Sequence, residues 1–392
     1  MRLRALKAKH GDAIILESGA ATVLIDGGPS GTYKLSLRDA LTRLPRDGHI
    51  DLMMVSHIDG DHIVGILDMT AEMIEARNDD KTPLVTIGDA WHNSFSDLLA
   101  DAAASTGETE ASAASTASTV TDLMISEDES SLVLSSVSQG RRLRDDLETL
   151  AVDTNRRFKG GHAIQGARRR EWKKGGLSVS VIGPTQEEID DLRVRWKRDL
   201  KKILDKENPA RTEAASGIDR SVTNLASLVC IAEDDDARVL LTGDARSDMI
   251  LDWLRAVGEL NDIVESGGDA GATVHFDVLK LPHHGSARNV TAEFFEKVRA
   301  DHYVVSGDGG HGNPDPAALT YLFETRPELD FTLHMTYTQD EISQNTTYKK
   351  KKRDIALERV LSVGNRRSVI RTPAPGAAFL DVEIGGTVEI AG

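Results

Sequence analysis

Short apolar runs separated by polar turns fill the first part of the chain. The runs 13–16 and 22–25 flank a Ser18-Gly19 turn, a pattern typical of a β-hairpin. The apolar residues of segment 35–44 recur at helical spacing. We therefore expect the chain to begin with two paired strands and a helix.

A third apolar run, 50–55, is interrupted only by Asp51 and predicts a buried strand. The polar segment 57–62 follows it directly. A loop at the end of a strand is where α/β proteins often collect their catalytic groups. Segment 57–62 is therefore the first candidate for a functional site.

The same rhythm returns in the second half of the chain. Strands are predicted at 177–184, 225–231, 238–242, 276–281, 302–306 and 378–384, and helices at 187–206 and 292–299. Such alternation of strands and helices predicts an α/β sandwich. We predict one domain over 1–345 with an insertion at about 95–175, and a basic segment and strand in 346–392 that pack on the same domain.

Composition limits this picture further. The 392 residues carry a formal net charge of −16, which opposes broad, non-specific binding to nucleic acid. The one cysteine, Cys230, excludes a disulfide within the chain and lies in an apolar run that predicts burial. Segment 101–131 is rich in Ala, Ser, Thr and acidic residues and predicts a surface insertion. No run has the length of a membrane span and no secretory signal is visible, so we expect a cytoplasmic protein that does not bind membranes.

The segment His57-Ile58-Asp59-Gly60-Asp61-His62 places four potential metal ligands within six residues. Alternate side chains of such a turn can face two points, and two divalent ions roughly 3.5–4 Å apart can clamp a scissile group and supply a metal-bound hydroxide. The alternative is a polar turn in which Asp61 caps a helix at Ile63. Four ligand-type side chains side by side are unfavourable without a cation, which favours the metal site.

Three further segments end in groups of the same kind. Asp244 closes one predicted strand, His283 and His284 follow another, and His311 lies in a glycine-rich loop. A carboxylate at such a position can bridge two metal ions. Adjacent histidines point in different directions, so one of His283 and His284 can bind metal while the other contacts substrate or donates a proton.

In this order, the segments resemble the metallo-β-lactamase superfamily, and within it the ComEC-type branch, the hydrolase domain of DNA-uptake competence proteins. The resemblance rests on segments 9–15, 24–28, 56–65, 224–244, 280–286 and 311–314. It implies an α/β fold, the four-layer αββα sandwich of that superfamily. The membrane channel of the competence proteins has no counterpart here, so DNA transport is not implied.

The resemblance also implies a ligand set for two divalent ions. His57 and Asp59 would hold one ion, Asp61 and His62 the other, and Asp244 would bridge them. Asp59 stands where the commoner motif has a histidine, and a carboxylate favours Mn²⁺ or Mg²⁺ more than imidazole does, with Zn²⁺ still possible.

Other residues would complete the metal shell or face the substrate. The resemblance gives His283 or His284 to the metal, His284 together with Asp61 to catalysis, Asp26 to the support of the ligands, and Ser286, His311 and Asn313 to the substrate. The superfamily's usual third-motif histidine is not obvious. His92 and His162 are the candidates, or that ligand is absent.

We expect a metal-dependent hydrolase, with a phosphodiesterase or nuclease as the first choice. The basic stretches 141–170 and 349–353 could follow a phosphate backbone, and Trp91 and Trp172 could stack on bases, although solvated surface and core packing are the ordinary roles of such residues. The alternatives are a hydrolase of the same fold for a thioester, lactone or lactam, and a regulatory module with an impaired metal site.

Overall fold

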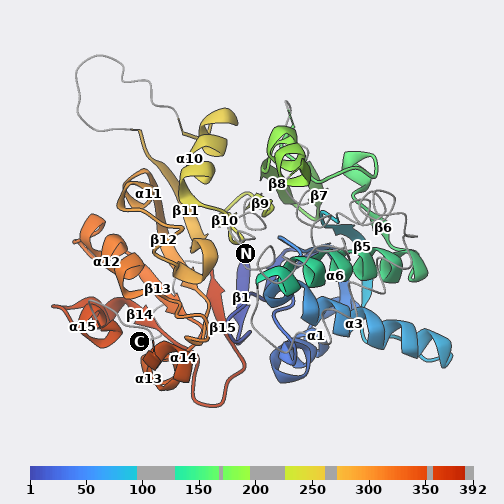
Figure 1. Ribbon diagram of the computed structural model, residues 1–392, viewed down its shortest axis with the longest axis horizontal. Helices are drawn as coiled ribbons and strands as arrows, with labels where there is room; N and C mark the ends of the chain where they lie inside the picture. The colour runs from blue at the N-terminus through green and yellow to red at the C-terminus, as the bar shows by residue number, and fades with distance from the viewer. Residues whose placement is uncertain (95–128, 167–170, 195–225, 261–271, 351–355, 385–392) are drawn as a thin grey trace, which may run out of the picture.

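The computed structural model describes residues 1–94, 129–166, 171–194, 226–260, 272–350 and 356–384, and its strands form two mixed sheets. Most of the predicted surface insertion at 101–131 lies outside these residues. Figure 1 shows the sheets between two groups of helices.

The first sheet has seven strands in the order β15-β1-β2-β3-β4-β5-β6. Their bounds are β1 Arg2–Leu6, β2 Ile14–Ser18, β3 Ala21–Ile25, β4 His49–Met54, β5 Thr86–Trp91, β6 Asp153–Thr154 and β15 Phe379–Glu383. The strands from β15 to β3 pair antiparallel, and those from β3 to β6 pair parallel. The hairpin expected at the start of the chain is β2 and β3.

The second sheet has eight strands in the order β14-β13-β12-β11-β10-β9-β8-β7. Their bounds are β7 Glu171–Lys174, β8 Leu177–Gly183, β9 Val229–Glu233, β10 Arg238–Leu241, β11 Val274–Lys280, β12 Val298–Val305, β13 Thr332–Met335 and β14 Ile370–Arg371. Here too, one half is antiparallel, from β7 to β10, and the other half is parallel, from β10 to β14.

Helices cover the outer face of each sheet. Over the first sheet lie η1 Tyr33–Leu37, α1 Arg38–Thr42, α3 Gly60–Asn78 and α6 Glu129–Thr149, with the short α2 Pro45–Gly48 leading into β4. The helices that pack against the second sheet are α10 Ser247–Ala256, α11 Ala292–Lys297, α12 Pro316–Thr325, α13 Gln339–Gln344, α14 Thr346–Lys350 and α15 Leu357–Leu361. Short 3₁₀ turns are η2 Arg156–Phe158, η3 Pro282–Gly285 and η4 Arg366–Val369.

Three hydrophobic layers show how the sheets and helices stack. Leu52 and Val278 lie in the layer between the two sheets, whereas Met53 packs under the helices of the first sheet and Leu279 under those of the second. Successive side chains of a strand point to opposite faces, which explains this alternation. The predicted α/β sandwich of four layers, helix–sheet–sheet–helix, is therefore confirmed.

Several smaller expectations can be compared with these layers. Cys230 is fully buried between the sheets, as its apolar run predicts. Trp91 and Trp172 are buried in the same layer, so they are packing residues and do not stack on bases. No helix among the described residues is long and apolar enough to cross a membrane.

Candidate metal centre

The parallel strands of both sheets bring their carboxyl ends to one place. Asp26 follows β3, and the segment from Ser56 onward follows β4. From the second sheet, Asp244 follows β10 and His284 follows β11. Side chains at the carboxyl ends of parallel strands meet along one edge of a sheet, and in a sandwich two such edges can share a site.

The segment 57–62 turns directly from β4 into α3. Asp59 has an extended backbone, and its carbonyl oxygen accepts hydrogen bonds from the N–H groups of His62 and Ile63, at 2.9 and 3.1 Å. Asp61 therefore lies inside the first turn of α3 and is not its cap. A side chain at Gly11 would collide with the carbonyl oxygen of Asp61, so glycine at position 11 lets the β1–β2 loop pack against this turn.

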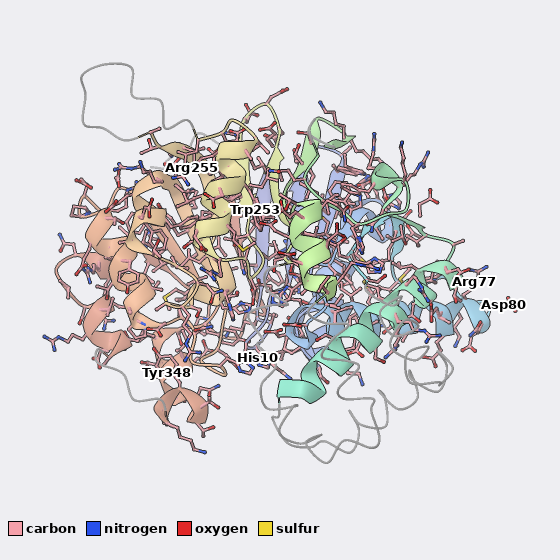
Figure 2. The ribbon with its side chains drawn as sticks, turned by 45° about the horizontal axis from the view of Figure 1, so that its top comes forward. His10, Arg77, Asp80, Trp253, Arg255 and Tyr348 are labelled. Carbon is pink, nitrogen blue, oxygen red and sulfur yellow. The ribbon has the colours of Figure 1, made fainter. Side chains whose placement is uncertain are left out.

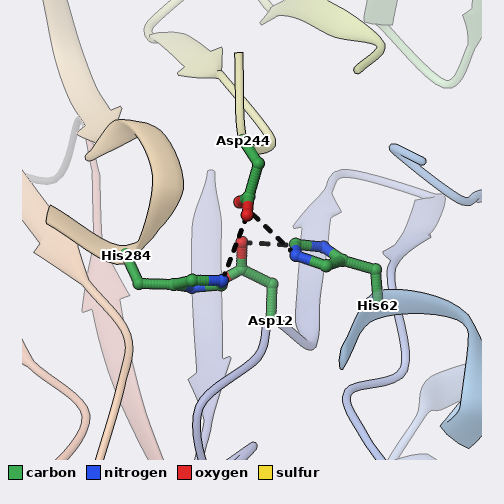
Figure 3. Close-up of side chains that lie close together, drawn as sticks. All are labelled: Asp12, His62, Asp244 and His284. Carbon is green, nitrogen blue, oxygen red and sulfur yellow. Dashed lines mark ion pairs between the residues drawn. The ribbon is translucent and has the colours of Figure 1, made fainter. Parts of the chain in front are cut away.

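Four side chains converge at this point: Asp12, His62, Asp244 and His284 (Figure 3). Asp244 Oδ1 lies 3.4 Å from His62 Nε2, and Asp244 Oδ2 lies 3.5 Å from His284 Nε2. Asp61 reaches the same space, with its two oxygens 3.7 Å from His284 Nε2 and 4.0 Å from His62 Nε2. Atoms that bind one divalent ion at about 2.1 Å are separated by about 3–3.5 Å, so these spacings are close to those of a shared ion.

A second set of ligand atoms comes from His57, Asp61 and His62. His57 Nε2 lies 3.7 Å from Asp59 Oδ2, and the rings of His57 and His62 are 4.0 Å apart. Asp59 is one-quarter exposed and accepts a hydrogen bond of 2.9 Å from Ser136 Oγ on α6. This set therefore reaches the edge of the site and offers fewer buried ligand atoms than the first.

The atoms that face this space have no hydrogen-bond partner among the described residues. They are Nε2 of His57, His62 and His284, together with Oδ1 of Asp244. Leaving a buried polar atom unpaired costs about 1–3 kcal/mol. Imidazole and carboxylate donors suit Zn²⁺ and Mn²⁺, so the residues present fit a divalent metal ion.

The other nitrogen of each of two histidines is held by a buried aspartate. His62 Nδ1 is 2.8 Å from Asp26 Oδ2, and Asp26 also accepts hydrogen bonds of 2.7 Å from the backbone N–H and the hydroxyl of Ser56. His284 Nδ1 is 3.0 Å from Ser306 Oγ and 3.3 Å from Asp12 Oδ1, and the Ser306 hydroxyl donates to the same Asp12 oxygen. A carboxylate behind a ligand histidine fixes its tautomer and ring orientation, and Asp26 lies behind His62 in this way.

The buried carboxylates of the site favour positive charge on the histidines beside them. Burial alone would lower the pKa values of His62 and His284, but Asp244 and either Asp26 or Asp12 hold both well above the ordinary value for histidine. Burial alone would raise the pKa of Asp244, yet the neighbouring histidines hold it well below its usual range. A divalent cation supplies the same positive charge without these protons, so metal and protons compete for the site.

His283 and His284 take different positions. Both have left-handed backbone conformations, with φ of 46° and 53°, and such strain is common in functional loops. His284 is buried among the converging side chains, whereas His283 is 27 % exposed with Nε2 3.6 Å from Asp244 Oδ2. His284 is therefore the buried member of the pair, and His283 faces the open side.

The residues expected to face the substrate are spread around this open side. Asn313 Nδ2 donates to the carbonyl oxygen of His283, at 3.3 Å, and so supports the loop. Ser286 is mostly buried and closes the η3 turn. The His311 ring meets the ring of His10 edge-on at 4.3 Å, and Figure 2 shows His10 between the two halves of the molecule.

The two candidates for a third-motif ligand lie elsewhere. His92 follows β5 and is buried, and neither it nor His162 belongs to a group of three metal-ligand side chains among the described residues. Burial, and then the charges of Arg144 and His162, lower the pKa of His92 to about 4. Within the described part of the chain, neither candidate therefore joins the metal centre.

The basic stretches are only partly described. On α6, the arginines 141, 142 and 144 pair with Asp145 and Asp146 of the same helix. Lys349 and Lys350 are exposed on α14, and residues 167–170 and 351–355 lie outside the described part of the chain.

Two charged residues of the site were not assigned a role from the sequence. Asp12 lies two positions after His10, and only its Gly-Asp sequence pointed toward the family. Lys280 stands in the apolar run Val278-Leu279-Lys280-Leu281, where a lysine is unexpected, and this was the available signal.

Comparisons with known proteins give short or loose likenesses. No family model matches the chain. Human microtubule-associated protein 1A is 38% identical over 74 residues, which is 19% of this chain and 3% of that protein, and bovine microtubule-associated protein 1S is 37% identical over 91 residues, 22% of this chain and 8% of that protein. The chain thus spans less than a tenth of the length of these curated relatives.

Two solved structures resemble the chain over most of its length. One, from Parabacteroides distasonis, is assigned as a metal-dependent hydrolase, with a TM-score of 0.34 and 10% identity over 85% of this chain and 92% of that one. The other is a metallo-β-lactamase of Cronobacter sakazakii, with a TM-score of 0.29 and 10% identity over 83% of this chain and 87% of that one. Both superpositions are loose.

Proposed function

We propose that this chain is a metal-dependent hydrolase of the metallo-β-lactamase superfamily with the motifs of its ComEC-type branch. The observation that carries the proposal is the set of unpaired buried atoms on His57, His62, Asp244 and His284. These atoms converge on one space, where a single cation could contact several of them, and this convergence favours a metal site over a regulatory module without metal.

The proposed metal shell combines the two sets of ligand atoms, adds Asp59 and leaves Asp12 behind the ligands. Asp61, His62, Asp244 and His284 would hold one divalent ion, and His57 and Asp59 would hold a second ion beside it, with Asp244 able to serve both. A bound Zn²⁺ or Mn²⁺ acts as a Lewis acid and makes water a good nucleophile near neutral pH.

The remaining groups of the chain would orient the reaction. Asp26 and Asp12 hold the two buried histidines in place from behind. On the open side, His283 Nε2 lies near Asp244 and can donate a hydrogen bond to the leaving oxygen of a substrate.

We further propose that the substrate is a phosphodiester, with nucleic acid as the first candidate. Phosphoryl oxygens need several N–H donors around them. Imidazoles of His10, His283 and His311 gather near the exposed side of the metal centre, where the charge of Asp61 acts on both His10 and His283. The ComEC-type motifs support the same class of substrate.

The test is hydrolysis of end-labelled single- and double-stranded DNA and of bis(p-nitrophenyl) phosphate, with Mn²⁺ or Zn²⁺ added. Asp61→Ala removes two carboxylate contacts to the histidine pair and is expected to lower kcat by at least 10²-fold with the fold intact. Lys174→Met, at the far end of the sandwich, is the control and should keep wild-type activity.

The outcomes separate the substrate classes. Cleavage that requires metal and disappears in Asp61→Ala supports a phosphodiesterase at this site. If the metal-loaded wild type cleaves a thioester or a lactone but no phosphodiester, the proposed substrate is wrong and the proposed metal-dependent hydrolase stands. A wild type that binds no divalent ion contradicts the whole proposal.

A further inference from the structure

Lys280 ends β11 inside the molecule and is 1 % exposed. Along this strand, Val278 faces the layer between the sheets and Leu279 faces the helices. Because strand side chains alternate, Lys280 shares the face of Val278 and points between the two sheets. A buried lysine is rare unless an anion pairs with it.

The ammonium group of Lys280 lies between two aspartates of the metal centre. It forms a close ion pair with Asp12 Oδ2, donates to the carbonyl oxygen of Gly243 at 2.9 Å, and lies 3.7 Å from Asp244 Oδ1. These contacts come from the β1–β2 loop, from the residues after β10 and from the end of β11. One lysine therefore ties together three segments that build the site.

Asp12 links Lys280 to His284, a candidate metal ligand. While Oδ2 faces Lys280, Oδ1 accepts a hydrogen bond from the hydroxyl of Ser306 and lies 3.3 Å from His284 Nδ1, and that hydroxyl is itself 3.0 Å from His284 Nδ1. His284 Nε2 is thereby left to face Asp244 and Asp61. Both oxygens of Asp12 are thus engaged behind the metal shell, although its carboxylate lies among the four converging side chains.

Asp12 has no other cationic side chain as close as Lys280 among the described residues. Without the Lys280 ammonium group, the carboxylates of Asp12 and Asp244 would face each other with no cation between them, and their repulsion would move Asp12 out of its present place. Asp12 would then no longer hold His284 Nδ1 in its present orientation. Supporting groups of this kind commonly change metal affinity by about 10–100-fold.

We propose that Lys280 is a positioning residue of the metal centre, a built-in cation that keeps Asp12 behind His284 and so orients the His284 imidazole before metal binds. The inference rests on the metal centre of the proposed function and adds a residue for which no role was predicted. It assigns Lys280 no contact with substrate.

The test measures Co²⁺ binding to the full chain by titration and by its visible absorption spectrum. Lys280→Met is expected to weaken Co²⁺ binding about 10–100-fold and to shift the visible bands, because His284 or Asp12 then coordinates differently. The double variant Asp12→Asn/Lys280→Met removes the uncompensated charge and keeps a carbonyl oxygen for His284 Nδ1. It is expected to bind Co²⁺ more tightly than Lys280→Met alone.

Lys174→Met is the control. Lys174 Nζ lies 2.5 Å from the buried carboxylate of Asp51, away from the metal centre, and this pair differs in that Lys174 is half exposed and Arg46 also contacts Asp51. This control should keep the wild-type Co²⁺ affinity and spectrum. If Lys280→Met also keeps both, or if the double variant binds no better than the single one, the inference is wrong.

Two further outcomes are decided by the same data. If Lys280→Met does not fold, a folded double variant with affinity within about tenfold of wild type supports the inference, and a folded double variant without binding overturns it. If the wild type binds Co²⁺ but hydrolyses no substrate, the proposed reaction is wrong. The role of Lys280 is then judged from the Co²⁺ affinities and spectra of the variants. A wild type that binds no Co²⁺ contradicts both.

Discussion

At the residue scale, each of two buried histidines of the site has an aspartate beside each of its two ring nitrogens. His62 and His284 turn one nitrogen toward Asp244 and the other toward an aspartate behind the ring. An imidazole has two nitrogens with distinct roles, and the one that binds metal is fixed by the hydrogen bond of the other. The orientation of the ligands therefore depends on residues that do not bind metal.

Asp26→Asn tests this dependence for His62. Asp26 has φ of 58°, a left-handed conformation that asparagine also tolerates, so the fold should survive. The variant loses the negative charge behind His62 Nδ1, and the metal affinity should fall about 10–100-fold in a calorimetric titration with Mn²⁺. Asp51→Asn, a buried carboxylate far from the site, is the control. Unchanged affinity in Asp26→Asn would contradict the supporting role.

The sequence predicted part of this site from local patterns. Six ligand-type residues in three short segments could be identified, because each follows an apolar run that reads as a strand. Asp12 and Lys280 could not be assigned, because their pairing joins residues 268 positions apart and depends on how the two sheets face each other. The choice between His283 and His284 also needed the structure, because left-handed backbone at both residues sets their directions.

At the scale of elements, α3 is held against the first sheet by a close backbone contact. A side chain at Gly65 would collide with the carbonyl oxygen of Gly27, and Gly65 N–H donates to Gly28 O at 2.9 Å. Because of this contact, the first turn of α3, which contains Asp61 and His62, lies beside Asp26.

Gly65→Ala should therefore destabilise the protein, although alanine is normally the better helix former. We expect a loss of about 1–3 kcal/mol in denaturant unfolding, because the helix must move away from the sheet. Gly60→Ala in the same helix meets only ordinary contacts, the nearest at 3.7 Å, and is the control. Equal stability of the two variants would show that the contact can relax.

A second element-scale feature ties the sheets together at the other end of β4. The Asp51 carboxylate is fully buried and contacts Arg46 at 2.6 Å, Lys174 of β7 at 2.5 Å and the N–H of Thr22 at 2.8 Å. Burial alone would raise the pKa of Asp51, but the hydrogen bonds from Arg46, Lys174 and Thr22 outweigh it and lower the pKa below the ordinary value.

A depressed pKa in the folded state gives stability that is present above the pKa of the unfolded chain, about 3.9, and is lost as the pH falls through the folded value. Asp51→Asn should thus lower stability at pH 7 and flatten its decline below about pH 4. Urea unfolding measured from pH 7 to pH 2 checks this. A variant with the same slope as wild type in the acid range would mean that other groups set the acid sensitivity.

The predicted elements agree with the structure where apolar periodicity is clear. The strands at 177–184 and 238–242 appear as β8 and β10 within a residue or so, because their side chains face packed layers on both sides. The edge strands β6 and β14 were not predicted, since two-residue strands carry no period.

At the scale of the whole molecule, the metal centre joins the two sheets. Asp26, His57 and His62 come from the first sheet, whereas Asp244 and His284 come from the second. A ligand that binds the folded state alone stabilises it by about 2.7 kcal/mol at 100 times its Kd.

Metal should therefore raise the melting temperature of the chain by several degrees in calorimetry, and a chelator should reverse the rise. Asp244→Ala removes the carboxylate between His62 and His284 and should abolish most of the shift. The same shift in Asp244→Ala and wild type would place the metal elsewhere in the molecule.

The α/β sandwich was predictable at this scale because two halves of alternating strands and helices have few ways to bury both faces of a sheet, and its four layers were what the resemblance to the metallo-β-lactamase superfamily implied. The strand order was not predictable, since the pairing of β15 with β1 joins segments from opposite ends of the sequence.

Because β15 pairs with β1, Met1 and Ile384 lie side by side. The nitrogen of Met1 donates to Ile384 O at 3.1 Å, and the N–H of Ile384 donates back to Met1 O at 2.9 Å. A short linker between these residues would close the described chain into a ring, which could be cut open at the exposed turn 362–365. Such a circular permutant keeps the spatial neighbours that the described residues give to the metal centre, so it should fold around the same site from new ends.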